Sequence, residues 1–229
     1  MRFPFLPKSR IENEALRLLA EYSNQFGLIV TPPIDVEGII ESLLGLDFRF
    51  DDLRSSLGEE VLGATWITKR IIRIDQSLDP TIDHRKEGRY RFTLAHEAGH
   101  WQLHRPIMES NLRQVNLFDF ETIPSIICRS DSKDPIEWQA DKFASYLLMP
   151  ESMIRDQWQQ HKSNCEQQQR VTDLNLTNSL IPLNNATIPS DNITRIMADI
   201  FKVSVQAMSI RLIELGILQS QDTTSVLFT

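Results

Sequence analysis

Cysteine is almost absent from this sequence, which excludes folds held together by covalent cross-links. Only Cys128 and Cys165 occur among the 229 residues, and two cysteines are too few for the disulfide framework of a small secreted domain. Free thiols in a reducing compartment are the simpler interpretation. The length of the chain allows one sizeable apolar core with an appendage, or two small domains.

Long apolar runs are missing as well. No stretch approaches the roughly 18 consecutive apolar residues of a membrane-spanning helix. Prolines and charges interrupt the N-terminal stretch MRFPFLPKSR, where a signal peptide has a continuous apolar region. We therefore expect a cytoplasmic protein with no membrane partner.

Positive charge is in deficit. The 24 lysine and arginine residues against 31 aspartate and glutamate residues give a formal net charge of −7. Proteins that coat DNA need clustered lysine and arginine to neutralise phosphates. The composition therefore argues against direct nucleic-acid binding by this chain.

The spacing of the apolar residues changes along the chain from a helical to an alternating pattern. Residues 11–26 and 36–44 repeat with the period of a helix, whereas apolar residues at 46–50 alternate with polar ones. Two further runs, 61–67 and 70–75, flank a polar pair and predict a β-hairpin. The sequence thus predicts an α+β fold with a small sheet of about three strands.

The part that follows the hairpin is expected to be mostly helical. One helix is predicted from about Gly88 to His104, ended by Pro106, because proline inside a helix removes a hydrogen bond. Residues 105–133 have weak periodicity and are predicted to form a long loop. A second helix is expected to begin at Pro135, which suits the first helical position.

Composition divides the chain into three expected parts. Residues 1–160 hold the sheet and its helices, the last of them a short helix at 151–160. Residues 161–190 shift to Gln, Asn, Ser and Thr, which is typical of a polar linker or mobile insertion. Residues 191–218 carry two helical stripes and predict a C-terminal helical pair.

The first helix after the hairpin contains the sequence His96-Glu97-Ala98-Gly99-His100. Residues four apart lie on one helix face, so the imidazoles of His96 and His100 can reach one zinc ion at about 2.0–2.1 Å. Glu97 is rotated by about 100° around the helix axis, from where its carboxylate can accept a proton from zinc-bound water. These residue types at this spacing point to a metallopeptidase helix.

Chance produces this pattern in roughly one chain of this length in a hundred or two, so its surroundings matter. Leu94, Ala95, Ala98 and Trp101 indicate that the helix is packed rather than exposed. Gly99 lets another element approach the backbone closely, although it costs about 1 kcal/mol of helix propensity relative to alanine.

A catalytic zinc site needs a third protein ligand and one open position. Glu137, on the predicted second helix, would complete a His-His-Glu site of the thermolysin kind. In the alternative interpretation Asp134 caps that helix and Glu137 is its partner in a capping box. Spacing alone does not decide between these two roles.

Two more residues have the spacing to support the ligands. Asp141 lies four residues after Glu137 and can accept a hydrogen bond from a ligand imidazole, fixing its tautomer. His104 lies four residues after His100, too far along a straight helix to share the metal with His96. It either supports a ligand or contacts substrate, or it is a helix-end histidine that interacts with the helix dipole.

The segments His96 to His104 and Glu137 to Ala144, followed by Leu147-Leu148-Met149-Pro150, resemble the ImmA/IrrE family of zinc metallopeptidases. That family pairs an HExGHxxLH-like helix with a later ExxA(D/N)xFA helix that ends in LLMP. Two separated motifs in the right order are more specific than either alone. The spacing between the two motifs is rather long here, because the predicted loop at 105–133 separates them.

The resemblance implies a zincin-like fold in which residues 1–160 are the metallopeptidase domain. It implies one zinc ion per chain, held by His96, His100 and Glu137, with Glu97 as the catalytic base. It also implies site-specific cleavage of a transcriptional repressor, an antirepressor activity, since many relatives are encoded beside or fused to a helix-turn-helix repressor of the Xre type. The substrate peptide is expected to add as a strand beside the hairpin.

Two other functions are consistent with parts of the sequence. A zinc-containing module can capture a repressor without cutting it. The terminal helical pair resembles a helix-turn-helix at its connection, but its only basic residues are Arg195, Lys202 and Arg211, a poor phosphate footprint. For this pair we favour packing or partner recognition over DNA binding.

Overall fold

The computed structural model describes residues 3–27, 30–112, 126–129, 134–176 and 190–219. The chain divides into two compact units, Met1–Leu148 and Met149–Thr229. Among the helices described, none combines the length and the apolarity that crossing a bilayer requires.

The first unit is built around a four-stranded mixed sheet. Its strands are β1 (Asp47–Asp51), β2 (Val61–Trp66), β3 (Ile71–Asp75) and β4 (Ile126–Arg129), in the order β1-β3-β2-β4. Strand β1 is parallel to β3, whereas β2 is antiparallel to both β3 and β4. The predicted α+β class and the β-hairpin are confirmed.

Strand β4 comes from the segment that was predicted to be a loop, and that prediction is wrong for these four residues. So short a strand gives almost no periodic signal, and only its pairing with β2 makes it a strand. Both edges of the hairpin are therefore occupied, one by β1 and the other by β4. A substrate strand cannot add directly beside β2 or β3, contrary to expectation; among the described strands, it can pair only with β1 or β4.

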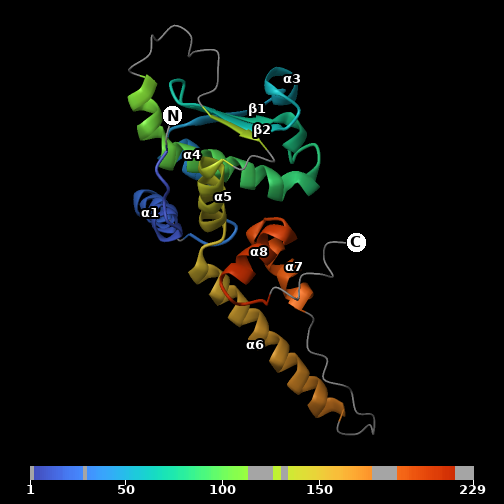
Figure 1. The fold of residues 1–229 in the computed structure, drawn as a ribbon. Helices are drawn as coiled ribbons and strands as arrows, with labels where there is room; N and C mark the ends of the chain where they lie inside the picture. Colours follow the sequence, from blue (N-terminus) through green and yellow to red (C-terminus); the bar gives the residue numbers. More distant parts are fainter. Residues whose placement is uncertain (1–2, 28–29, 113–125, 130–133, 177–189, 220–229) are drawn as a thin grey trace. The chain divides into compact units, whose positions relative to one another are not determined.

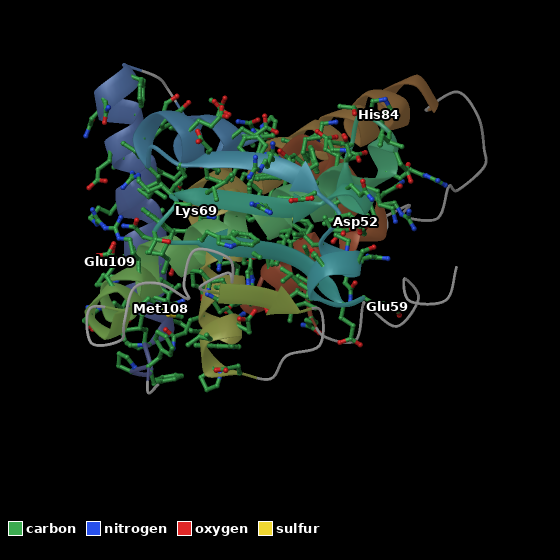
Figure 2. The ribbon with its side chains drawn as sticks, turned by 90° about the horizontal axis from the view of Figure 1, so that it is seen from above. Asp52, Glu59, Lys69, His84, Met108 and Glu109 are labelled. Carbon is green, nitrogen blue, oxygen red and sulfur yellow. The ribbon has the colours of Figure 1, made fainter. Side chains whose placement is uncertain are left out.

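Three helices lie in layers on one side of the sheet (Figure 1). Helix α4 (Glu87–Leu112) packs on β2 and β3, α5 (Pro135–Leu148) packs on α4, and α1 (Lys8–Phe26) packs on α5. Figure 2 shows that α4 runs along the sheet, from the end marked by His84 and Asp52 to the end marked by Lys69 and Glu109. Shorter elements complete this unit: α2 (Val36–Gly38), the π-helical turn η1 (Ile39–Leu43), α3 (Leu53–Leu57), and the 3-10 turns η2 (Gln76–Leu78) and η3 (His84–Lys86).

Helix α4 does not end at Pro106, so the predicted helix end is wrong. Proline removes one backbone hydrogen bond, but it does not force a helix to stop where packing holds both sides of it. The buried face of α4 includes Trp101 and His104 before the proline and Met108 after it, which are 2%, 1% and 8% exposed. This helical spacing keeps the last turns of α4 in place.

The second unit contains α6 (Glu151–Leu176), α7 (Ser190–Phe201) and α8 (Val205–Glu214). The helix predicted at 151–160 is longer than expected and extends into the segment that was expected to be a linker. The predicted helical pair is present, and the Ser204 hydroxyl caps α8 by accepting from the Ala207 N–H. Arg211 is only 2% exposed, and its Nε donates to the Met149 carbonyl. Burial of Arg211 leaves Arg195 and Lys202 as the exposed basic residues of the pair, which weakens the DNA-binding alternative further.

Gly99 sets how closely α4 and α5 approach. A Cβ atom at this position would lie 3.1 Å from the Cβ and Cδ1 atoms of Phe143 and 3.3 Å from the Cα atom of Ala140. All three of these neighbours belong to α5, and both residues are completely buried. The helices therefore touch at a point where only glycine fits without movement.

We predict that Gly99→Val destabilises the first unit by about 1–3 kcal/mol, because the added methyl groups overpack the contact between α4 and α5. Denaturant unfolding measures this difference. The matched control is Gln102→Val on the same helix, whose side chain is partly exposed, and it should cost less than about 1 kcal/mol. Equal stability of the two variants would show that the close contact is not limiting.

Candidate metal centre

Helices α4 and α5 bring together the three residues that were expected to bind a metal ion. The Nε2 atom of His96 lies 2.9 Å from Nε2 of His100 and 3.1 Å from Oε2 of Glu137. The Nε2 atom of His100 lies 3.3 Å from Oε1 of Glu137. These three residues are 3%, 0% and 6% exposed. All three ligand atoms lie within 4.8 Å of one another, so the group can hold one metal ion.

The charge states of the group suit a cation. Burial raises the pKa of Glu137, but hydrogen bonds with His100 and His96 outweigh burial and bring that pKa down to about 2. Burial lowers the pKa of His100 to about 4. At neutral pH the carboxylate is therefore ionised and this imidazole is neutral, which are the states in which both groups bind metals.

The side chain of Glu137 does not take part in capping α5. The carboxylate of Asp134 accepts from the N–H of Ile136 at 3.2 Å, which satisfies a free donor of the first turn of α5. The carboxylate of Glu137 instead lies against the two histidines. Asp134 thus caps the helix, while the geometry favours a ligand role for Glu137.

Each histidine has a partner on the nitrogen that faces away from the cluster. The Nδ1 atom of His96 lies 2.8 Å from Oδ1 of Asp141, and Nδ1 of His100 lies 3.0 Å from Nδ1 of His104. Such partners orient a ligand imidazole and set its tautomer. His104 is not a helix-end residue, because α4 continues to Leu112. Both residues therefore lie where a supporting role requires them.

Glu97 is enclosed by strand β2 above α4. It is completely buried, and its Oε2 accepts from the hydroxyl of Thr65 at 2.6 Å. Its Oε1 has no hydrogen-bond partner among the described residues. A Cβ atom at Gly63 would lie 2.6 Å from this Oε1, so glycine leaves the space that the carboxylate occupies.

The contributions of Gly63 and Thr65 were not identified from the sequence. The available signal was a glycine and a threonine inside an otherwise apolar strand, since glycine in a strand often marks the close approach of another group. Which group approaches cannot be read from the strand itself, because Glu97 is 32 residues away from Thr65 in the chain.

Burial dominates the titration of Glu97. Loss of solvation raises the pKa of this carboxyl to about 7, although the nearby His96 and the Thr65 hydroxyl act in the opposite direction. A carboxylate with a pKa near neutrality can both accept and release a proton under physiological conditions. Glu97 therefore has the properties of a general base.

We predict that metal-free Glu97→Gln is more stable than the metal-free wild type at pH 8. A folded-state pKa raised from 4.5 to about 7 favours folding below pH 4.5, and this contribution is lost as the pH rises through 7. The advantage of the variant should be about 3 kcal/mol at pH 8, because each pKa unit between 4.5 and 7 corresponds to about 1.4 kcal/mol, and it should disappear below about pH 4. Denaturant unfolding with chelator at both pH values measures it, and Glu109→Gln, at a half-exposed position of α4, is the control. A pH-independent difference would contradict the raised pKa.

Comparison with family models gives a match to Peptidase_M78, described as the IrrE N-terminal-like domain, over residues 49–212. Comparison with the curated proteins gives no match. The matched span is more than half of the 229 residues, begins within β1 and ends within α8. It contains the buried group His96, His100 and Glu137, which can hold a metal ion. The chain therefore belongs to the Peptidase_M78 family of IrrE N-terminal-like domains.

Proposed function

We propose that this protein is a zinc-dependent endopeptidase. One observation carries the proposal: Glu97 presents a buried carboxylate oxygen without a hydrogen-bond partner among the described residues, on the same helix as two of the three clustered ligand residues. A buried, unpaired carboxylate oxygen costs free energy, and a role in proton transfer explains why it is present. Membership of a peptidase family supports the same reaction class.

The donor set suits zinc. Two imidazoles and one carboxylate are the protein ligands of catalytic zinc in thermolysin-type sites, and here His96, His100 and Glu137 would hold the ion. When bound, zinc supplies a water of lowered pKa and polarises the scissile carbonyl group. Asp141 and His104 would keep the two imidazoles oriented from behind.

Glu97 would move the proton during peptide hydrolysis. Its Oε1 accepts a proton from the attacking water, and the same oxygen then gives this proton to the amine nitrogen of the departing peptide. The hydroxyl of Thr65 holds the other oxygen, so the carboxylate cannot rotate freely. Strand β2 thus keeps the base in one orientation through both proton transfers.

We further propose that the substrate is a transcriptional repressor of the helix-turn-helix, Xre type, cut at a specific site. The family membership supports a peptidase, and the sequence resemblance implies that its target is a regulatory protein. The net charge of −7 also suits a DNA-binding partner, because such proteins carry a basic face that an acidic chain attracts.

A second candidate is a zinc-containing module that binds the repressor without cutting it. The observation in its favour is burial: the three ligand residues and Glu97 are between 0% and 6% exposed. A peptide can reach these groups only if covering atoms move aside. Binding without cleavage needs no such access.

For the metal, we predict that the purified protein binds one zinc ion per chain and that Glu137→Ala weakens this binding by about 100-fold or more. Loss of an outer partner of a zinc ligand already weakens binding by about 10-fold to 100-fold, and loss of a ligand itself should cost at least as much. Zinc content after dialysis and competition with a chelator measure it. Glu109→Ala removes a half-exposed carboxylate from α4 and should leave zinc binding unchanged. Undiminished zinc content in Glu137→Ala would remove this residue from the ligand set.

For the reaction, we predict that Glu97→Gln keeps its zinc but loses repressor cleavage by a factor of about 100 or more, the contribution of a general base. Incubation with a candidate repressor, followed by mass spectrometry of the fragments, detects the cut. Relief of repression in a reporter assay separates the two candidate functions. Full antirepressor activity of Glu97→Gln would favour the binding module over the protease.

A further inference from the structure

A series of four polar groups, which we call the relay, runs from the imidazole of His100 to a carbonyl of the N-terminal arm, which we define as residues 3–7. The Nδ1 atom of His100 lies 3.0 Å from Nδ1 of His104, and Nε2 of His104 lies 3.4 Å from Oε1 of Gln139. The Nε2 atom of Gln139 donates to the carbonyl oxygen of Pro4 at 3.1 Å. His100, His104 and Gln139 are between 0% and 1% exposed, so the contacts among these three side chains are shielded from bulk water.

The direction of every hydrogen bond in this relay follows from its last member. A backbone carbonyl can only accept, so Gln139 must present its NH2 group to Pro4 and its Oε1 to His104. His104 must then donate from Nε2, which in the neutral imidazole leaves its Nδ1 as an acceptor. His100 must donate from Nδ1, which leaves its Nε2 with a free lone pair. That lone pair is directed at the cluster formed with His96 and Glu137.

Side-chain packing holds the arm against α4 and α5. The ring of Phe3 meets the ring of His104 edge-on with centroids 5.4 Å apart. The ring of Phe5 stacks on Trp138 at 5.6 Å, and Leu6 is 8% exposed. Aromatic pairs at these separations contribute about 0.5–1.5 kcal/mol each beyond the area they bury. The carbonyl of Pro4 is therefore placed by contacts on both sides of it.

We propose that the N-terminal arm is a positioning element of the metal site, and that the Pro4 carbonyl selects the tautomer of His100 through Gln139 and His104. The role of the selected tautomer rests on the proposed zinc site, because only an imidazole with a free Nε2 lone pair can bind a metal from that atom. His96 needs no relay, since Asp141 accepts from its Nδ1 directly.

A cavity beside the relay explains why the position of the arm affects the tautomers of the two histidines. This cavity of about 430 Å³ is lined by Pro4, His104 and Gln139, among other residues. If the arm lifts away, water from the cavity can take the place of the Pro4 carbonyl. Water both donates and accepts, so it allows Gln139 to turn over and both histidine tautomers to form. Attachment of the arm therefore determines what fraction of the protein is ready to bind the metal.

The first experiment needs no variant and no metal. Long-range proton–nitrogen correlation spectra of the ¹⁵N-labelled, metal-free protein at neutral pH distinguish the two neutral tautomers of each histidine. We expect the proton on Nδ1 of His100 and on Nε2 of His104. A proton found mainly on Nε2 of His100 would overturn the proposal.

The second experiment removes the polar contacts of Gln139. In Gln139→Leu we expect a mixture of His100 tautomers and zinc binding weaker by about 10-fold to 100-fold, the usual effect of losing an outer partner of a ligand. The matched control is Gln102→Leu, the same exchange at a cavity-lining position whose side chain makes no hydrogen bond among the described residues. It should change neither the spectra nor zinc binding. Zinc affinity of Gln139→Leu within twofold of the control would overturn the proposal.

The third variant tests the arm itself and guards against a folding defect in Gln139→Leu. Phe5 is 71% exposed, so Phe5→Ala removes the stack on Trp138 without opening the core. We expect it to mix the tautomers of His104 and His100 and to weaken zinc binding severalfold. If His100 and His104 in Phe5→Ala keep the single tautomers of the wild type, the proposed role of the arm is overturned. If the protein bound no zinc at all, the proposed function would fail, whereas the spectra of the metal-free protein would still decide the tautomer selection.

Discussion

The close contact between α4 and α5 at Gly99 is the constraint on which the rest of the site depends. Glu137 and Asp141 belong to α5, whereas His96, Glu97, His100 and His104 belong to α4. With Phe143 and Ala140 in contact with the backbone of α4, the carboxylates of α5 reach the imidazoles at 2.8–3.3 Å. Even a small separation of the helices would break these contacts, because hydrogen bonds weaken steeply with distance.

Burial gives the site its chemical character once the helices are in place. It raises the pKa of Glu97 to about 7 and lowers the pKa of His100 to about 4. For Glu137, the hydrogen bonds with the two histidines outweigh burial and lower the pKa to about 2. Glu137 and Glu97 thus take different states: at neutral pH the carboxylate of Glu137 is ionised, whereas that of Glu97 is partly protonated. Strand β2 contributes to this difference by covering Glu97 with Gly63 and Thr65.

Several features were predictable because they depend on residues close together in sequence. The shared face of His96 and His100 follows from helix geometry alone, and the β-hairpin follows from two apolar runs around a short polar turn. Predictions failed where a local rule competed with packing. Pro106 did not end α4, because the buried face continues to Met108. Strand β4 was missed because four residues carry no period that distinguishes a strand from a loop.

The sequence by itself determined the helix that carries the two histidines and the glutamate beside them, and its second motif indicated Glu137 as a candidate third ligand. Only the tertiary structure decided that Glu137 turns toward the histidines rather than toward its own helix end. It also decided that Thr65 holds Glu97, and that the Pro4 carbonyl lies at the end of a relay starting from His100. These pairs are separated by 32 residues or more in the chain, and at such separations spacing carries no information about direction. Contact between them depends on how the layers pack.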